Sequence, residues 1–389
     1  MPKTLRLPRA DGTITRYRVL GEPVPQIKGP PFRTRAAYAA AHVVVDPLAN
    51  LSPSLGAALD WKATLAYRRY LWSLGFGVAE AMDTAQRGMG LTWAHVQELI
   101  RRSVAEARRL GAPIACGAGT DQLPPIHPAT LDAVRAAYEE QCAFIEGVGG
   151  RVILMASRAL ARAARTPDDY ASVYGAILSQ VSRPVILHWL GEMFDPALHG
   201  YWGHEDLAQA IDSCLDLIRQ YSEKIEGIKL SLLDADLETA LRRQLPEGVK
   251  LFTGDDWHYP DLILGDPTGY SHALLGIFDA IAPVAATALR ALDAGNVDTY
   301  RSRMASTLAL SRHIFAPPTQ FYKTGLVLLA YLNGHQSHFK MVGGLESMRS
   351  TVHLAKAFIL ADQAGLLADP DLAAARMHPL LTLAGVSQE

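Results

Sequence analysis

The chain has 389 residues, a formal net charge of −2 and 49% hydrophobic residues, which suits one barrel-sized domain with extensions and lacks the basic field that attracts nucleic acid. Its three cysteines are too far apart in sequence for a metal or redox motif, and their odd number argues against a disulfide framework. The first residues lack a secretory apolar stretch, and no apolar run reaches roughly 18 residues, so we expect a cytoplasmic protein without a membrane partner. From the lack of a basic field we expect no nucleic-acid partner.

Residues 1–35 carry the signals of an N-terminal arm. Asp11-Gly12 is a turn sequence, and residues 14–20 after it alternate apolar and polar side chains. A turn dipeptide beside an alternating segment is typical of a β-hairpin. The arm shows no residues that suggest chemistry.

Short apolar runs alternate with helical segments from about residue 41 onward. The helices include 58–74 and 93–110, where apolar residues recur with the period of an amphipathic helix. Another helix is predicted to start at Thr166-Pro167, where a capping hydroxyl precedes a proline. The apolar runs predict eight buried strands, at 42–45, 77–79, 113–116, 151–155, 184–188, 227–230, 249–252 and 269–273.

Eight strands that alternate with helices favour an α/β fold of the closed (β/α)8 TIM-barrel type. Each strand is too apolar to have a solvated face, which is typical of a parallel sheet covered by helices. No G-x-G-x-x-G follows the first strand to favour a dinucleotide-binding sheet. We therefore predict an arm over 1–35, a barrel over 36–296 and a C-terminal helical extension over 297–389.

The carboxyl ends of barrel strands form the active-site face, so each strand nominates candidate residues. Lys229 is the most informative of them because it lies inside an apolar strand, where burial of an ammonium lowers its pKa and leaves a fraction of neutral amine for imine formation. The other candidates are Asp46, Asp83, Thr84, Ser157, His188, Trp189, Glu192, Asp255, Asp256 and His272.

Each candidate also has a structural interpretation. Lys229 could pair with a carboxylate as a structural lysine, and His188 could be a satisfied core histidine or a proton carrier. Asp255 and Asp256 could cap the helix that follows their strand. The loops that carry Trp189, Trp202 and Trp257 could line a pocket or only cover the barrel mouth.

Several segments resemble, in the same order, the dihydrodipicolinate synthase and N-acetylneuraminate lyase superfamily of class I aldolases, and the chain looks like a divergent branch of it. The resemblance covers about residues 41–283. Gly227-Ile228-Lys229 resembles the family's Schiff-base strand, and Thr253-Gly254-Asp255-Asp256 resembles its Ser-Gly-Asp-Asp segment. Further matches are Val45-Asp46-Pro47, Ala58-Leu59-Asp60-Trp61, Cys116-Gly117-Ala118-Gly119-Thr120, Arg183-Pro184-Val185-Ile186-Leu187 and Gly269-Tyr270-Ser271.

The departures from this family concern the substrate. His188 stands where the family has a proton-relaying tyrosine, and Asp83-Thr84-Ala85-Gln86-Arg87 stands where Gly-Thr-Thr-Gly-Glu grips a keto-acid carboxylate. Asp83 places a negative charge near the position of that carboxylate, which disfavours pyruvate as an obligatory donor. Met193 stands near the expected substrate-binding arginine, and Ser157 lies in the region of the fourth-strand tyrosines.

The resemblance implies a Schiff-base-forming lyase or aldolase that acts on a keto acid or a sugar-derived keto compound. In this hypothesis Lys229 forms the imine and His188 moves protons. Substrate contacts are expected from Asp83, Thr84, Ser157, Trp189, Glu192, Asp255 and His272. We expect no metal, no cofactor and a homo-oligomer.

Two other functions stay open from sequence alone. The acids and histidines at the strand ends could hold a divalent ion in a metal-dependent, sugar-processing barrel enzyme, although no compact ligand motif such as H-E-x-x-H is present. A non-catalytic sugar-binding barrel could also retain this scaffold.

Overall fold

The computed structural model describes residues 4–53, 55–124 and 129–389 of the chain. Residues 35–40 and 77–276 form one compact unit, and residues 1–34, 41–76 and 277–389 form another. The predicted three-part division of the chain stays a prediction. We call the unit of residues 35–40 and 77–276 the barrel unit, and the other the helical unit.

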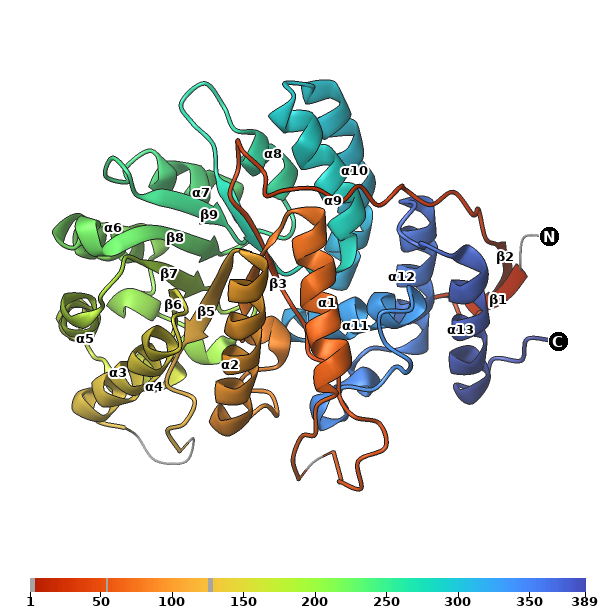
Figure 1. Cartoon of the computed structure of the whole chain (residues 1–389), viewed down its shortest axis with the longest axis horizontal. Coiled ribbons are helices and arrows are strands. Elements are labelled where there is room, and N and C mark those ends of the chain that lie inside the picture. The colour runs from red at the N-terminus through yellow and green to blue at the C-terminus, as the bar shows by residue number, and fades with distance from the viewer. Residues whose placement is uncertain (1–3, 54, 125–128) are drawn as a thin grey trace. The chain divides into compact units, whose positions relative to one another are not determined.

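The barrel unit is a closed barrel of eight parallel strands in the order β10-β3-β4-β5-β6-β7-β8-β9 (Figure 1). This confirms the predicted (β/α)8 fold class. The strands are β3 (Ala37–Ala40), β4 (Gly77–Glu80), β5 (Ile114–Ala118), β6 (Val152–Met155), β7 (Val185–Leu190), β8 (Ile225–Ser231), β9 (Lys250–Thr253) and β10 (His272–Leu275).

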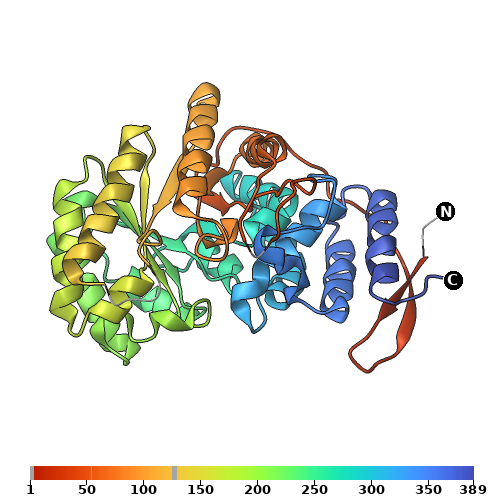
Figure 2. The ribbon, with the colours of Figure 1, turned by 90° about the horizontal axis from the view of Figure 1, so that it is seen from below.

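Helices within the barrel unit connect successive strands and lie outside them (Figure 2). They are α2 (Trp93–Leu110), α3 (Leu131–Gly147), α4 (Arg158–Ala163), α5 (Pro167–Gln180), α6 (Leu207–Gln220), α7 (Ala235–Arg242) and α8 (Tyr259–Leu264). Thr166 forms a capping box with Asp169 at the start of α5, as predicted from the Thr-Pro pair.

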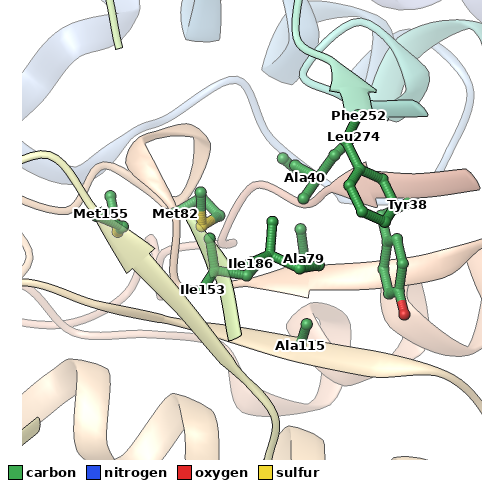
Figure 3. Packing of buried hydrophobic residues seen from close by; sticks show 10 residues of the cluster. All are labelled: Tyr38, Ala40, Ala79, Met82, Ala115, Ile153, Met155, Ile186, Phe252 and Leu274. Carbon is green, nitrogen blue, oxygen red and sulfur yellow. The ribbon is translucent and has the colours of Figure 1, made fainter. Parts of the chain in front are cut away.

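The barrel interior is filled by side chains from successive strands (Figure 3). Tyr38 and Phe252 pack edge to face with ring centroids 6.2 Å apart. The cluster continues through Ala40, Ala79, Met82, Ala115, Ile153, Met155, Ile186 and Leu274. The interior is therefore a packed core rather than a pore.

Two predicted strands are misplaced. The first strand is Ala37–Ala40 and not 42–45. Residues 42–45 instead bond within the helical unit: His42 N donates to Asp279 Oδ2 (2.8 Å), Val44 N donates to Thr64 Oγ1 (3.0 Å), and Val45 forms an isolated antiparallel bridge with Leu59. The last strand starts at His272 and not at Gly269, because residues 266–269 form a tight turn with Gly269 at a φ of +146°.

The helical unit contains the predicted N-terminal hairpin and C-terminal helices. Strands β1 (Thr4–Pro8) and β2 (Ile14–Arg18) pair in an antiparallel manner, and the hairpin packs on helices α12 and α13 (Figures 1 and 2). The helices are α1 (Trp61–Leu74), α9 (Phe278–Asp293), α10 (Val297–Ile314), α11 (Tyr322–Leu332), α12 (Thr351–Gln363) and α13 (Pro370–Leu383). Among the residues described, no helix combines the length and apolar character needed to cross a membrane.

Candidate active site

Lys229 and His188 lie opposite each other on the neighbouring strands β8 and β7. Lys229 is also level with Phe252 on β9, and His188 is level with Met155 on β6. Because side chains alternate between the two faces of a strand and both Phe252 and Met155 belong to the interior cluster, Lys229 and His188 point into the barrel. Their exposed fractions are only 5% and 2%. The structure therefore brings the two predicted catalytic residues together inside the barrel.

Burial changes the protonation of both groups. Desolvation lowers the pKa of the Lys229 ammonium, while the negative charges of Asp83 and Asp256 oppose that decrease. Desolvation and the positive charge of Lys229 together lower the pKa of His188 well below the ordinary imidazole value, against a smaller opposing effect of Asp83. His188 is therefore neutral at pH 7, and Lys229 holds more neutral amine than an exposed lysine.

His188 has one ring nitrogen without a hydrogen-bond partner among the described residues. Its Nε2 atom is 3.5 Å from Ser231 Oγ, which is the outer limit of a hydrogen bond. Its Nδ1 atom is buried and has no hydrogen-bond partner within the described part of the chain. A buried polar atom left without a partner costs about 1–3 kcal/mol, so a bound molecule that pairs with Nδ1 would recover that free energy.

Gly254 makes room for the Lys229 side chain. It follows β9, and its backbone N donates to Leu230 O at 2.8 Å. A Cβ atom at this position would lie 2.8 Å from Lys229 Cε and 2.1 Å from Ser231 Oγ. The glycine therefore allows a close backbone approach beside the lysine.

Asp83 and Thr84 form a short 3-10 turn, Asp83–Ala85, at the C-terminal end of β4. Asp83 is half-buried and Thr84 is buried. The Asp83 carboxylate acts electrostatically on both Lys229 and His188, so the structure places its charge in the same site.

Arg87, in the same segment, serves the scaffold. Its guanidinium pairs with Asp121 at 2.6 Å, and it also donates to the Gly117 carbonyl and to Gln141 Oε1. These bonds tie the loop after β4 to the end of β5 and to α3. The Arg87 charge is therefore balanced locally by Asp121.

Asp255 and Asp256 have different roles. Asp255 accepts hydrogen bonds from the backbone N atoms of Trp257 (2.8 Å) and His258 (2.9 Å) and from His258 Nδ1 (2.8 Å). It thus closes the turn before α8. Asp256 is buried, and its charge raises the pKa of Lys229. Of the two aspartates, Asp256 is therefore the one whose charge acts on Lys229. The sequence had placed Asp255, and not Asp256, among the predicted substrate-binding residues.

Ser157 is engaged as a helix cap. Its Oγ accepts from Leu160 N (3.0 Å) at the start of α4 and shares a hydrogen bond of 2.6 Å with Thr120 Oγ1. Its backbone N donates to the Tyr201 hydroxyl at 3.1 Å. Its predicted contact with substrate stays a prediction.

Trp189 and Glu192 lie apart from the barrel interior. Trp189 follows His188 on β7 and so points to the other face of the strand, where it packs edge to face on Trp202. Glu192 pairs with His199 at the surface. Trp189 and Glu192 both line a separate cavity of about 180 Å³.

His272 is the first residue of β10. Its Nδ1 accepts a hydrogen bond from Ala36 N (2.9 Å), just before β3 begins. Burial, aided by the charges of Lys250 and Arg35, lowers its pKa to about 4. All three partners lie at the amino ends of strands, so His272 lies at the opposite end of its strand from the active-site face.

Asp46, the remaining candidate, lies in the helical unit. It is exposed, and its carboxylate accepts from Leu48 N at 2.9 Å within its own turn. Within the described residues, no three His, Cys, Asp or Glu side chains are grouped so that they could hold a metal ion.

Comparison with protein-family models assigns the chain to a family. The model of the family described as "Protein of unknown function (DUF993)" matches residues 5–386. The chain belongs to this family. A search of curated proteins finds no match.

Solved structures with the same fold as this DUF993 protein include dihydrodipicolinate synthase from Aquifex aeolicus, at a TM-score of 0.65 and 13% identity over 86% of this chain and 99% of the other. The enzyme from Thermotoga maritima has a TM-score of 0.63 and 13% identity over 85% and 100% of the two chains. A prophage protein of the dihydrodipicolinic acid synthase family from E. coli K12, solved in complex with pyruvate, has a TM-score of 0.62 and 14% identity over 91% and 99%. The predicted resemblance is thus confirmed at the level of the fold.

Gly254 offers a test of how the DUF993 barrel holds its lysine. We expect Gly254→Ala to lower stability by about 1–3 kcal/mol, since overpacking a well-filled core costs that much, and to displace Lys229 from its position. Urea unfolding followed by fluorescence measures the first effect. Gly147→Ala is the matched control, because a Cβ there meets no atom within 4 Å. An unfolding midpoint of Gly254→Ala equal to that of the control would contradict the tight packing.

Proposed function

We propose that this protein is a Schiff-base-forming carbon–carbon lyase or aldolase that acts on a keto acid or a sugar-derived keto compound. The observation that carries the proposal is the buried Lys229 amine beside the neutral imidazole of His188 on adjacent barrel strands. The shared fold with dihydrodipicolinate synthases supports it, as does the shared fold with the E. coli prophage protein of that family, which was solved in complex with pyruvate.

In the proposed mechanism the neutral Nζ of Lys229 attacks the substrate ketone carbon to give a carbinolamine. Loss of water gives a protonated imine, which accepts the electron pair of the breaking carbon–carbon bond. His188 takes the proton of the hydroxyl group on the departing aldehyde carbon. It then returns that proton to the resulting enamine carbon, and water hydrolyses the imine to release the second product and regenerate Lys229.

The charges around Lys229 favour a hydroxylated substrate over a bare keto acid. Asp83 and Asp256 both act on the lysine, and a substrate carboxylate would be repelled by them. Arg87 lies in the same segment as Asp83, but its guanidinium is already paired with Asp121, so we do not assign it to a substrate carboxylate. A carboxylate accepts hydrogen bonds from hydroxyl groups, and a threonine hydroxyl can both donate and accept. We therefore propose that Asp83 and Thr84 bind substrate hydroxyls.

Borohydride trapping tests the proposal directly. The protein is incubated in turn with pyruvate, dihydroxyacetone, keto sugars and keto sugar acids, reduced, and measured by intact-mass spectrometry with peptide mapping. We expect an adduct on Lys229 with a hydroxylated ketone. Ligand-induced thermal stabilisation without any adduct, in both the native protein and a Lys229→Ala variant, would favour a non-catalytic binding barrel instead.

Asp256 gives a prediction about pH. Its negative charge raises the pKa of Lys229, so Asp256→Asn lowers that pKa and leaves more neutral amine at a given pH. The acid limb of the pH dependence of imine trapping should therefore move to lower pH. Asp261→Asn, at an exposed position on α8, is the control and should leave the profile in place. A shift to higher pH in the Asp256 variant would contradict the assigned electrostatics.

A further inference from the structure

One cavity lies in the helical unit and is lined by residues of that unit alone. It measures about 770 Å³, within the range of roughly 300–1,000 Å³ typical of small-molecule sites. The N-terminal hairpin forms one wall, and α10 and α12 form the other, in the region where Figures 1 and 2 show the hairpin beside the C-terminal helices. We call it the hairpin cavity.

The hairpin cavity has an apolar surface that could receive a hydrocarbon or aromatic body. Val352 and Ile359 are both half-buried on α12, where they are separated by two helical turns and so lie on one face. Pro8 and Ala10 add apolar groups from the hairpin. Apolar lining with a few polar groups is the usual composition of a ligand pocket.

The charged groups of the hairpin cavity are mainly positive. Arg9 and Lys356 line it and are exposed to solvent. Asp11 is the acidic lining residue; its carboxylate accepts from Thr13 N (2.9 Å) and Thr13 Oγ1 (2.6 Å) and also interacts with the charge of Arg9, which leaves Lys356 as the second cation of the lining. Arg349 adds a further positive charge that lowers the pKa values of His313 and His353. An anion would therefore meet a favourable potential.

Two stacked imidazoles belong to the wall of the cavity. The rings of His313 and His353 lie 4.0 Å apart at an interplanar angle of 21°, and His313 Nε2 donates to the His353 carbonyl at 2.9 Å. His353 Nε2 is buried and has no hydrogen-bond partner within the described chain. Burial, with the charges of His313 and Arg349, lowers the pKa of His353 to about 3. The imidazole is thus neutral at pH 7 and adds no positive charge of its own.

The first turn of α12 adds to the positive field. Ser350 caps this helix through its Oγ, which accepts from His353 N at 3.2 Å, and Ser350, Val352 and His353 all line the cavity. A helix N-terminus carries a partial positive charge.

We propose that the hairpin cavity is a second ligand site, which binds a small organic anion with an apolar or aromatic body. The anionic group pairs with Arg9 and Lys356, and the body packs on Val352 and Ile359. This site is independent of the chemistry proposed for Lys229, because every group that forms it belongs to the helical unit.

The fluorescent aromatic sulfonate 8-anilinonaphthalene-1-sulfonate is a suitable probe, because it combines one negative charge with an apolar body. We expect the full-length protein to bind one equivalent, with affinity that falls as salt rises. The double variant Arg9→Gln/Lys356→Gln should weaken binding at least tenfold. Uncharged N-phenyl-1-naphthylamine should bind at least tenfold more weakly than the anion to the native protein.

A charge-matched control separates the site from general electrostatics. Lys62→Gln/Arg301→Gln removes the same two charges from exposed positions of the helical unit outside the cavity lining and should leave the dissociation constant unchanged. Ile359→Trp fills the cavity and should abolish binding while circular dichroism shows a folded chain. Equal affinity in the two double variants, equal affinity for the neutral dye, or absence of saturable binding would overturn the proposal.

Discussion

Replacing Lys229 with methionine should abolish the borohydride-trapped adduct and reduce turnover by at least about 10⁴-fold, since the covalent nucleophile is lost. The described residues level with Lys229 on the two neighbouring strands are His188 and Phe252, and neither side chain can form an imine. The next inward-facing lysine, Lys250, is level with Gly227, one inward position before Lys229, and its Nζ is paired with Glu226 at 3.1 Å. Intact-mass spectrometry of the reduced protein measures the adduct, and an assay of aldehyde release measures turnover.

Two further variants separate imine chemistry from charge and packing. Lys229→Arg keeps a positive charge near Asp83 and Asp256, but a guanidinium does not form an imine at neutral pH; it should behave like the methionine variant. Lys250→Met removes a lysine from the neighbouring strand and should still form the adduct. Retention of the adduct in Lys229→Met, or its loss in Lys250→Met alone, would rule out Lys229 as the nucleophile.

The barrel and the position of its central pair could be predicted because both depend on the local pattern of apolar runs and amphipathic helices. Each strand except the first was marked by a short run of branched or otherwise apolar residues, and two of these runs contain Lys229 and His188 in strands that proved adjacent. Successive side chains of a strand point to opposite faces, so Trp189 must face away from His188. This could be inferred from the sequence alone. The first strand was missed because it is Ala-Tyr-Ala-Ala, and alanine is a poor indicator of β-structure.

The remaining site residues depended on geometry beyond the strands. His272 was predicted near the end of a strand over 269–273, but the turn at Gly269 delays the strand, so His272 is its first residue. Asp255 and Asp256 follow the end of β9, where alternation no longer fixes side-chain direction. The turn hydrogen bonds show that Asp255 holds the turn before α8, and the charge of Asp256 acts on Lys229.

Replacing His188 with glutamine should preserve the imine but reduce turnover by about 10²- to 10⁴-fold, the usual contribution of a positioned acid or base. The physical reason is that Lys229 and its carboxylate neighbours are unchanged, while the proton carrier at the adjacent strand is lost. Trapping yield with borohydride reports imine formation, and steady-state assay of aldehyde release reports turnover. Ser231→Ala is the matched control, because it removes only the long 3.5 Å contact to Nε2.

Proton exchange isolates the step assigned to His188. The enamine is protonated at carbon, so the native protein should incorporate deuterium from D₂O into the released ketone, and the His188→Gln variant should do so slowly. Because burial and Lys229 hold the pKa of His188 well below its ordinary value, protonation of this imidazole should not limit activity near pH 6.5. Normal exchange and turnover in the glutamine variant would eliminate the proton-carrier role. Loss of the adduct as well would instead make His188 a residue that positions Lys229.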